Sequence, residues 1–303
     1  MRSRLSVLAM LAGLLTMGCA PRVEPTNAVT AVPTSVPAMV AAPTGAPTQS
    51  APAITSAGGG EPVTFTIVYD NNAYDSSLRT DWGFACLVEI GEARVLFDTG
   101  DNGAILLDNM EALGFDPQMV DVVVLSHAHH DHTGGLSALL DTGATPTVYV
   151  PASFSASFKN GVRAKTNLVE ITDPVEIVPG VHTTGEVGSG TTEQALVVQT
   201  DEGLVVITGC AHPGVVEMVR RAKESVEGIG AADVFLVMGG FHLGSAGRGQ
   251  IEGIIADFRD LGVQGVAPCH CTGDRARQMF AEEYGDRCTL AGVGQVFLVG
   301  GAE

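Results

Sequence analysis

The sequence predicts an α/β fold in which helices cover β-sheets, and three observations lead to this prediction. Short apolar runs typical of strands recur from Val63 almost to the C-terminus. Helical segments stand between the later runs. Polar His, Asp and Cys side chains stand beside small residues where the runs end. Alternating strands and helices are typical of covered sheets, and sites in such folds are built at strand ends.

The expected strands are short runs rich in Val, Ile, Leu and Phe. In the first half they cover residues 63–69, 84–90, 94–98, 121–126 and 147–150. In the second half they cover residues 195–200, 204–208, 233–238, 265–268 and 295–300.

The expected helices cover residues 104–113, 135–141, 213–226, 249–261 and 275–284. Pro213 stands near a helix start, and Gly114 and Gly262 stand just after helix ends. Proline is favoured in the first helical turn and glycine just past the last one, so this punctuation supports the boundaries.

Residues 1–19 resemble a bacterial lipoprotein signal rather than part of the fold. Arg2 and Arg4 precede an apolar run that ends at a small residue before Cys19. The resemblance implies acylation of Cys19, and we expect an exported protein held at the membrane by this N-terminal lipid anchor only. The alternative is an ordinary cleaved signal followed by a chance cysteine.

Residues 20–61 are rich in Pro, Thr, Ala, Ser and Gly and have neither a helical nor a strand period. Such a composition predicts a disordered tether. The folded domain is therefore expected over residues 62–303.

The charge balance excludes some classes of partner. The chain carries 34 acidic against 16 basic residues, a formal net charge of −18. Nucleic-acid binding depends on Lys and Arg that neutralise phosphates, so we expect no nucleic-acid partner. We expect a small-molecule substrate, and the sequence leaves the oligomeric state open. An anionic substrate would need a local cationic centre such as a metal ion.

The stretch LSHAHHDHTGG concentrates metal-ligating side chains. In six consecutive positions it holds His127, His129, His130, Asp131 and His132. Imidazole and carboxylate are the usual ligands of Zn²⁺, and of Fe or Mn. His127 and His129 are two residues apart at the end of a strand, so an extended backbone projects both to one side. His130 points away from His129 by its parity, and we expect it not to bind.

Asp131 and His132 follow where the chain turns toward a helix expected to begin near residues 133–135. The two pairs, His127 with His129 and Asp131 with His132, could face a common volume and reach different points in it. Each pair then needs a distant partner to complete a metal site.

The run HAHHDH fits the His-x-His-x-Asp-His motif of the metallo-β-lactamase superfamily, and VLFDTG upstream resembles its first motif. The resemblance extends from about Val63 to the C-terminus. TGCAHPG, MGGFHL and PCHCTG resemble the branch that includes the dihydropterin ribofuranosylaminobenzene 5'-phosphate synthases. The resemblance implies a four-layer αββα sandwich with a metal centre at one edge of its two sheets.

The resemblance also implies two ligand sets for one or two divalent ions, with Zn²⁺ expected before Fe or Mn. The first set is His127, His129 and a later histidine, for which we choose His212. The second set is Asp131, His132 and a later histidine, for which we choose His270.

Cys210 departs from the family pattern. Many dinuclear members end the strand that corresponds to VVITG with an Asp that bridges both metals. A thiolate binds Zn²⁺ and can bridge, but it is softer than a carboxylate. Three interpretations stay open: Cys210 is a ligand, it lies beside the metals, or the site holds one tight metal. The structural alternative is a small buried apolar thiol.

Asp98 is interpreted as an acceptor for the N–H of a ligand imidazole, which fixes tautomer and ring orientation. The alternative is a turn Asp before Thr99 and Gly100. His242 lies between glycines after an apolar strand, and we expect it either to contact substrate or act as general acid, or to be structural.

Four further residues have open roles. His182 is expected to be structural or exposed, with replacement of His212 as a ligand as the alternative. Glu186 is a further polar candidate. Cys269 and Cys271 alternate around His270, so that one or both face the core.

We expect a metal-dependent hydrolase of ester-, phosphoester- or lactone-type substrates, in which a metal lowers the pKa of a water. Asp131 would hold or orient this water. One alternative is a synthase that joins a phosphoribosyl donor to an aromatic amine. Another is a non-enzymatic surface lipoprotein that binds or senses metal. These classes differ in whether the metal keeps an open, exchangeable position.

Overall fold

A computed structural model describes residues 62–226 and 233–301. The predicted signal segment 1–19 and the predicted tether 20–61 lie outside the described residues. Within the described ranges, no helix has the length and apolar character needed to cross a membrane.

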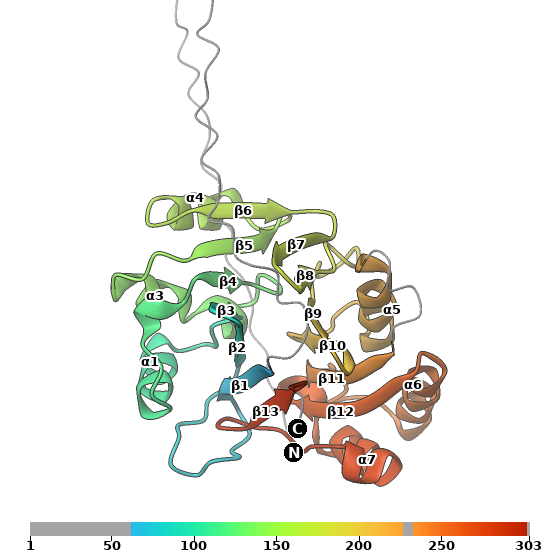
Figure 1. The fold of residues 1–303 in the computed structure, drawn as a ribbon. Helices are drawn as coiled ribbons and strands as arrows, with labels where there is room; N and C mark the ends of the chain where they lie inside the picture. Colours follow the sequence, from blue (N-terminus) through green and yellow to red (C-terminus); the bar gives the residue numbers. More distant parts are fainter. Residues whose placement is uncertain (1–61, 227–232, 302–303) are drawn as a thin grey trace, which may run out of the picture. The chain divides into compact units, whose positions relative to one another are not determined.

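The first sheet has seven strands in the order β13-β1-β2-β3-β4-β5-β6 (Figure 1). Strands β3 to β6 are parallel, whereas β13, β1, β2 and β3 pair antiparallel. The strands are β1 (Val63–Asp70), β2 (Phe84–Ile90), β3 (Ala93–Phe97), β4 (Val122–Val124), β5 (Thr147–Pro151), β6 (Leu168–Ile171) and β13 (Val296–Val299).

The second sheet has six strands in the order β12-β11-β10-β9-β8-β7. Strands β10, β11 and β12 are parallel, and β7, β8, β9 and β10 pair antiparallel. The strands are β7 (Val175–Val178), β8 (Val181–Thr183), β9 (Leu196–Thr200), β10 (Gly203–Thr208), β11 (Val234–Gly240) and β12 (Val263–Cys269).

Helices form the two outer layers, with α1, α3 and α4 beside the first sheet and α5, α6 and α7 beside the second (Figure 1). The α-helices are α1 (Gly103–Ala112), α2 (His130–Thr133), α3 (Leu136–Asp141), α4 (Ala156–Arg163), α5 (Val215–Ser225), α6 (Arg248–Asp260) and α7 (Asp274–Tyr284). Short 3₁₀ turns are η1 (Pro117–Met119), η2 (His270–Thr272) and η3 (Gly285–Arg287).

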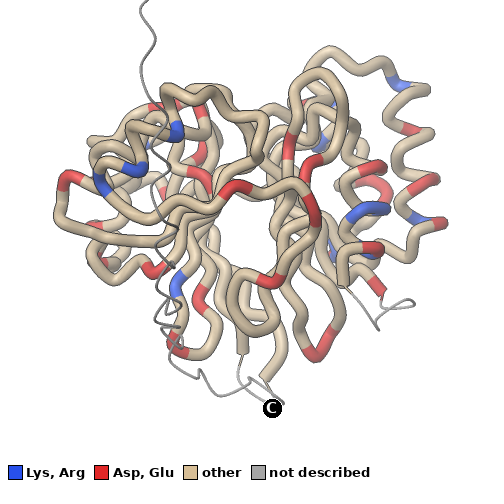
Figure 2. Tube along the Cα trace, turned by 90° about the horizontal axis from the view of Figure 1, so that it is seen from above, with Lys and Arg blue, Asp and Glu red and all other residues tan. Residues whose placement is uncertain are grey.

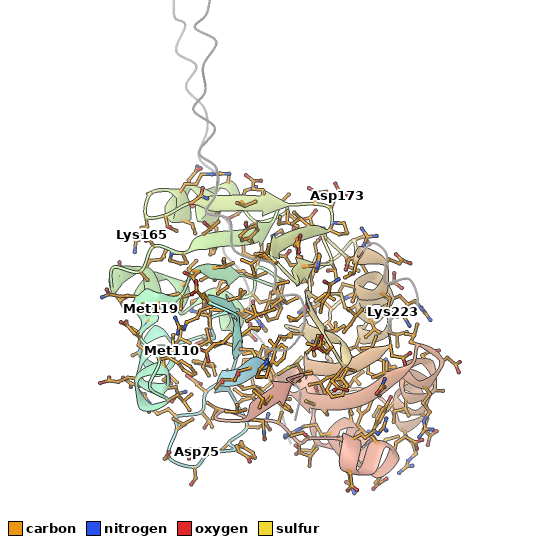
Figure 3. The ribbon with its side chains drawn as sticks, viewed as in Figure 1. Asp75, Met110, Met119, Lys165, Asp173 and Lys223 are labelled. Atoms are coloured by element: carbon orange, nitrogen blue, oxygen red, sulfur yellow. The ribbon has the colours of Figure 1, made fainter. Side chains whose placement is uncertain are left out.

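Strand alternation explains why two sheets carry three apolar cores. In β10, Val205 and Ile207 belong to the core between the sheets, whereas Leu204 and Val206 belong to the core under α5, α6 and α7. Successive strand side chains point to opposite faces, so both faces of each sheet are covered. Figure 3 shows side chains throughout the layers, with Met110 on α1. Met110 lies in the third core, between α1, α3 and the first sheet.

The predicted αββα sandwich is confirmed by these layers and cores. The sequence reading missed α4 and the strands β6, β7 and β8. Their apolar signals are weak, because β6 and β7 are edge strands and β8 has only three residues. In addition, β7 has no fully buried residue, and α4 buries only Val162. The helix expected over residues 135–141 is α3, whereas the separate turn α2 within the histidine cluster was not predicted.

The ends of the parallel strands bring distant segments together. Asp98 follows β3, Ser126 follows β4, and Cys210 and His270 follow β10 and β12. Gln194 joins the two sheets here, because its backbone N–H donates to the Ser126 carbonyl at 2.9 Å. Its side-chain amide donates to the Leu125 carbonyl at 2.9 Å. The polar strand ends therefore share one edge of the sandwich.

Candidate metal centre

The first group of ligands consists of His127, His129 and His212. The His127 Nε2 lies 2.9 Å from the His129 Nδ1, and the His212 Nε2 lies 3.1 Å from that same Nδ1. His127 is completely buried, while His212 is partly exposed. Three imidazole nitrogens thus converge at one point, at the distance range of ligands around a single small cation.

The second group consists of Asp131, His132 and His270. The Asp131 Oδ2 lies 3.6 Å from the His132 Nε2 and 3.4 Å from the His270 Nε2. Asp131 and His132 come from the single turn α2, and His270 begins η2 after β12. The structure therefore brings together all six residues that the sequence reading chose as ligands, in two adjoining groups.

Cys210 stands where the two groups meet. Its sulfur lies 3.3 Å from the His132 Nε2. It belongs to a set with Asp131, His132 and His270, and to another with His127 and His212, each with ligand atoms within 4.8 Å of one another. A Cys210 thiolate could therefore reach a metal ion in either group.

We predict that Cys210→Ser lowers the occupancy of the second group more than that of the first. The reason is that the sulfur directly faces His132, whereas the first group retains three imidazoles. Metal equivalents would be measured on the purified full-length protein by elemental analysis. Cys288→Ser, which alters a half-exposed thiol after η3, is the matched control. Unchanged stoichiometry in Cys210→Ser would show that the thiol is not a ligand.

Asp98 and Ser126 contact the Nδ1 atoms of His132 and His127 and hold these two rings in place. The Asp98 Oδ2 lies 2.6 Å from the His132 Nδ1, and it accepts the Ser126 hydroxyl at 2.7 Å. The Asp98 Oδ1 accepts the Ser126 backbone N–H at 2.7 Å, and the Ser126 Oγ lies 2.9 Å from the His127 Nδ1. A Cβ at Gly209 would lie 2.1 Å from the Ser126 Oγ, so glycine is needed for this close approach.

Glu193 is a supporting residue that the sequence reading missed. It is completely buried, and its carboxylate accepts the backbone N–H groups of Cys210, Ala211 and His212 at 2.8 to 2.9 Å. These three hydrogen bonds fix the segment that carries the candidate ligands Cys210 and His212. A lone Glu just before the apolar run ALVVQT was the only signal in the sequence.

Asp70 and Asn71 support His270 and were also missed. The Asp70 Oδ2 accepts the His270 backbone N–H at 3.1 Å. The Asn71 Oδ1 lies 2.9 Å from the His270 Nδ1, which leaves the Nε2 facing Asp131. Asp70 ends the first apolar run as Asp98 ends the third, and this shared position at a strand end could have identified it.

Four non-glycine residues in the described part have positive φ, and all four belong to this centre. They are Asp98 (φ 58), Ala211 (φ 59), His242 (φ 53) and His270 (φ 45). L-residues rarely adopt this region, and such conformations persist only where surrounding contacts hold them. The contacts from Glu193 and Asp70 provide that restraint for Ala211 and His270.

Electrostatics set the protonation of the second group. Burial lowers the pKa of His132, but the adjacent Asp98 charge and hydrogen bond prevail and raise it to about 9. Burial raises the pKa of Asp131, but the neighbouring imidazoles of His270 and His132 hold it below its usual range. Without metal, Asp131 is therefore a carboxylate at neutral pH, and His132 carries the proton that a metal would displace.

In the first group the imidazoles of His127 and His212 are neutral. Burial, followed by the charge on His132 and other imidazoles, lowers the pKa of His127. Burial, followed by the charge on His242, lowers the pKa of His212 to about 4. Neutral imidazoles offer their lone pairs to a metal at neutral pH.

Four other polar residues lie outside these two groups. His130 is exposed, with its Nε2 3.9 Å from Asp101. His182 lies on β8, 3.9 Å from Glu176. The Glu186 carboxylate accepts the Ser153 backbone N–H at 2.7 Å and serves a loop. His242 is exposed but close, with its ring centroid 4.4 Å from that of His212.

The donor set fits a divalent metal ion. The His270 Nε2 is buried without a hydrogen-bond partner. Buried polar atoms are normally satisfied, so this nitrogen is free to bind a cation that Asp131 would also hold. Imidazole, carboxylate and thiol donors within 4.8 Å of one another match the ligand chemistry of Zn²⁺.

The central part of the chain matches a known protein family. Residues 83–243 match the metallo-beta-lactamase superfamily, a range that includes every ligand candidate except His270. The chain belongs to the metallo-β-lactamase superfamily. This superfamily of enzymes has a fold that implies a divalent metal, typically Zn²⁺.

The chain is similar to one curated protein and to two solved structures. Over 269 residues it is 30% identical to 7,8-dihydropterin-6-methyl-4-(beta-D-ribofuranosyl)-aminobenzene-5'-phosphate synthase of Methanocaldococcus jannaschii, with 73% of this chain and 90% of that protein covered. The solved structure of a metal-dependent hydrolase of the β-lactamase superfamily has TM-score 0.66 and 29% identity, and covers 78% of this chain and 99% of that one. Zn²⁺-bound PqqB from Methylobacterium extorquens has TM-score 0.53 and 15% identity, with 77% of this chain and 99% of that one covered, and it supports the fold alone.

Trp82 provides a direct reporter of metal binding. It is the only Trp of the chain, and its ring centroid lies 5.0 Å from that of His270. We predict that Zn²⁺ added to metal-free protein changes the Trp emission, because the charge on the neighbouring imidazole changes. His270→Ala should abolish the change, and His182→Asn should retain it. Bound Zn²⁺ with unchanged emission in the unaltered protein would contradict the prediction.

Proposed function

We propose that the domain is a metal-dependent hydrolase that acts on ester-, phosphoester- or lactone-type substrates. The observation that carries the proposal is the pair of adjoining ligand groups, with the Asp131 carboxylate between the His132 and His270 nitrogens. A divalent metal held by these residues would lower the pKa of a water and stabilise negative charge on the substrate.

The residues of the chain have distinct tasks in this proposal. His127, His129 and His212 would hold the first ion, and Asp131, His132 and His270 the second. Asp131 is 18% exposed by its side chain, so one carboxylate oxygen can accept a hydrogen bond from the attacking water and orient it. Asp98, Ser126, Asp70 and Asn71 fix the imidazoles that surround this water.

The positive charge that a polarised substrate needs would come from the metal ions. Figure 2 shows Lys and Arg positions mainly in the helix layers at the two sides, with Asp and Glu positions near the centre of that view. Several of these bases pair with acids of their own helix, such as Arg220 with Glu217 and Arg248 with Glu252. These Arg side chains are therefore held in ion pairs on the surface of their helices.

The test combines metal analysis of the full-length protein with a hydrolysis screen of chromogenic phosphodiesters, lactones and thioesters. We expect bound Zn²⁺ and turnover in at least one class. Asp131→Asn should lower kcat by roughly 100-fold or more, because it removes the group that orients the water. Asp101→Asn, a half-exposed neighbour of His130, is the matched control. Protein that binds no metal under any condition would overturn the proposal.

A second candidate is a synthase that joins a phosphoribosyl donor to an aromatic amine. It is favoured by the 30% identity to the synthase from Methanocaldococcus jannaschii. The measurement is pyrophosphate release from a phosphoribosyl donor in the presence of an aromatic amine. Amine-dependent release without turnover of any hydrolysis substrate would favour the synthase. Bound metal with neither activity would favour a metal-binding or metal-sensing role.

A further inference from the structure

A third group of potential ligands adjoins the centre and shares only Cys210 with the two metal sets. Cys210, His242 and Cys271 each place one ligand atom within 4.8 Å of the others. The residues come from three parallel-strand ends, after β10, β11 and β12. Their chemistry differs from that of the other two groups, because two of the three donors are sulfur.

The local backbone is built to bring these side chains together. A Cβ at Gly240 would lie 2.7 Å from the Cys271 sulfur and 3.2 Å from the His270 Cδ2. Only glycine therefore lets the Cys271 sulfur approach at this point. His242 two residues later has φ 53, a conformation that needs restraint in a residue with a side chain.

The Cys271 sulfur has only a long contact to a protein oxygen. The Cys271 sulfur lies 3.7 Å from the Cys210 carbonyl oxygen. Cys271 is half-buried and His242 is exposed, so this group opens toward solvent, whereas Cys210 is buried. An ion could reach the group from outside without crossing the two inner ligand groups.

We propose that Cys210, His242 and Cys271 form a third, sulfur-rich metal subsite that takes a thiophilic divalent ion such as Zn²⁺ or Cd²⁺. Two thiolates and one imidazole are a ligand set that selects soft or borderline ions over Mg²⁺, Ca²⁺ or Mn²⁺. Cys210 is shared with the inner centre, which couples occupancy of the subsite to that of the second ligand group. In this proposal His242 is a ligand and not the general acid.

The test uses Cd²⁺ as the probe on metal-free full-length protein kept reduced with a non-thiol reductant. Cd²⁺ bound by thiolates gives an ultraviolet charge-transfer absorption that grows with the number of Cd–S bonds. We expect Cys271→Ser to lose one equivalent of bound Cd²⁺ and part of the absorption. His242→Asn should weaken the same equivalent, and this exposed position keeps the test valid if Cys271→Ser fails to fold.

Two control variants separate the subsite from general effects. Cys288→Ser removes a half-exposed thiol elsewhere, and His182→Asn removes a histidine on β8, so both should bind Cd²⁺ as the unaltered protein does. Equal Cd²⁺ equivalents and equal absorption in Cys271→Ser and the unaltered protein would overturn the proposal. The inner ligand groups would still bind metal in that case, so the proposed hydrolase function would stand.

Discussion

Asp98→Asn is expected to lower the affinity of the second ligand group for Zn²⁺ by roughly 10- to 100-fold. The carboxylate accepts the Nδ1 proton of His132 at 2.6 Å, so once a metal displaces the other ring proton, the Nε2 lone pair faces Asp131 and Cys210. An amide N–H₂ at the Oδ2 position would instead donate to Nδ1. The His132 proton would then move to Nε2 and block the ligand position.

Asparagine is the informative substitution at this position. Asp98 has φ 58, a conformation that Asn adopts more easily than other non-glycine residues. Asp98→Ala adds backbone strain and leaves His132 and Ser126 donors unpaired in a fully buried place. We expect Asp98→Ala to lose about 3–5 kcal/mol of the free energy of unfolding, as in buried ion pairs that lose one partner.

Affinity would be measured by competition with a chelator, and stability by urea unfolding of metal-free protein. Asp101→Asn is the matched control, because it alters a partly exposed carboxylate three residues away that contacts only His130 among the histidines. If Asp98→Asn binds Zn²⁺ as tightly as the unaltered protein, the tautomer of His132 is not set by Asp98.

The ligand candidates could be chosen from the sequence for two reasons. His127 and His129 share a side of an extended segment, and the resemblance to the metallo-β-lactamase superfamily led to His212 and His270, which both follow apolar runs. Strand ends of one sheet meet at an edge, so this position carries information about three-dimensional proximity. The apolar runs that form β3, β4 and β10 were also evident, because both faces of these strands are buried.

The supporting residues could not be chosen in this way. Asp70 and His270 are 200 residues apart, and Glu193 lies 17 residues before Cys210, so their pairing depends on how the sheets associate. A buried carboxylate that accepts backbone N–H groups has no sequence pattern of its own. The exposed strand β7 was missed for a different reason, since an edge strand needs no apolar alternation.

Glu193→Ala is expected to have the largest effect outside the ligands. It would leave the backbone N–H groups of Cys210, Ala211 and His212 without an acceptor in the core. Each unpaired buried donor costs about 1–3 kcal/mol, so we expect a loss of about 3 kcal/mol or more in urea unfolding. Ala211, with φ 59, would relax once these bonds are gone, and His212 would move away from His129.

Glu193→Gln separates the metal effect from general destabilisation. Its amide oxygen could still accept the Cys210 and Ala211 N–H groups, which share the Oε1 atom. Its N–H₂ group would face the His212 N–H, donor against donor, so the first ligand group should weaken more than the second. Glu186→Gln, which alters a carboxylate that accepts one loop N–H, should leave both groups unchanged. Equal weakening of both groups in Glu193→Gln would mean that Glu193 supports the fold of this edge as a whole and does not position His212.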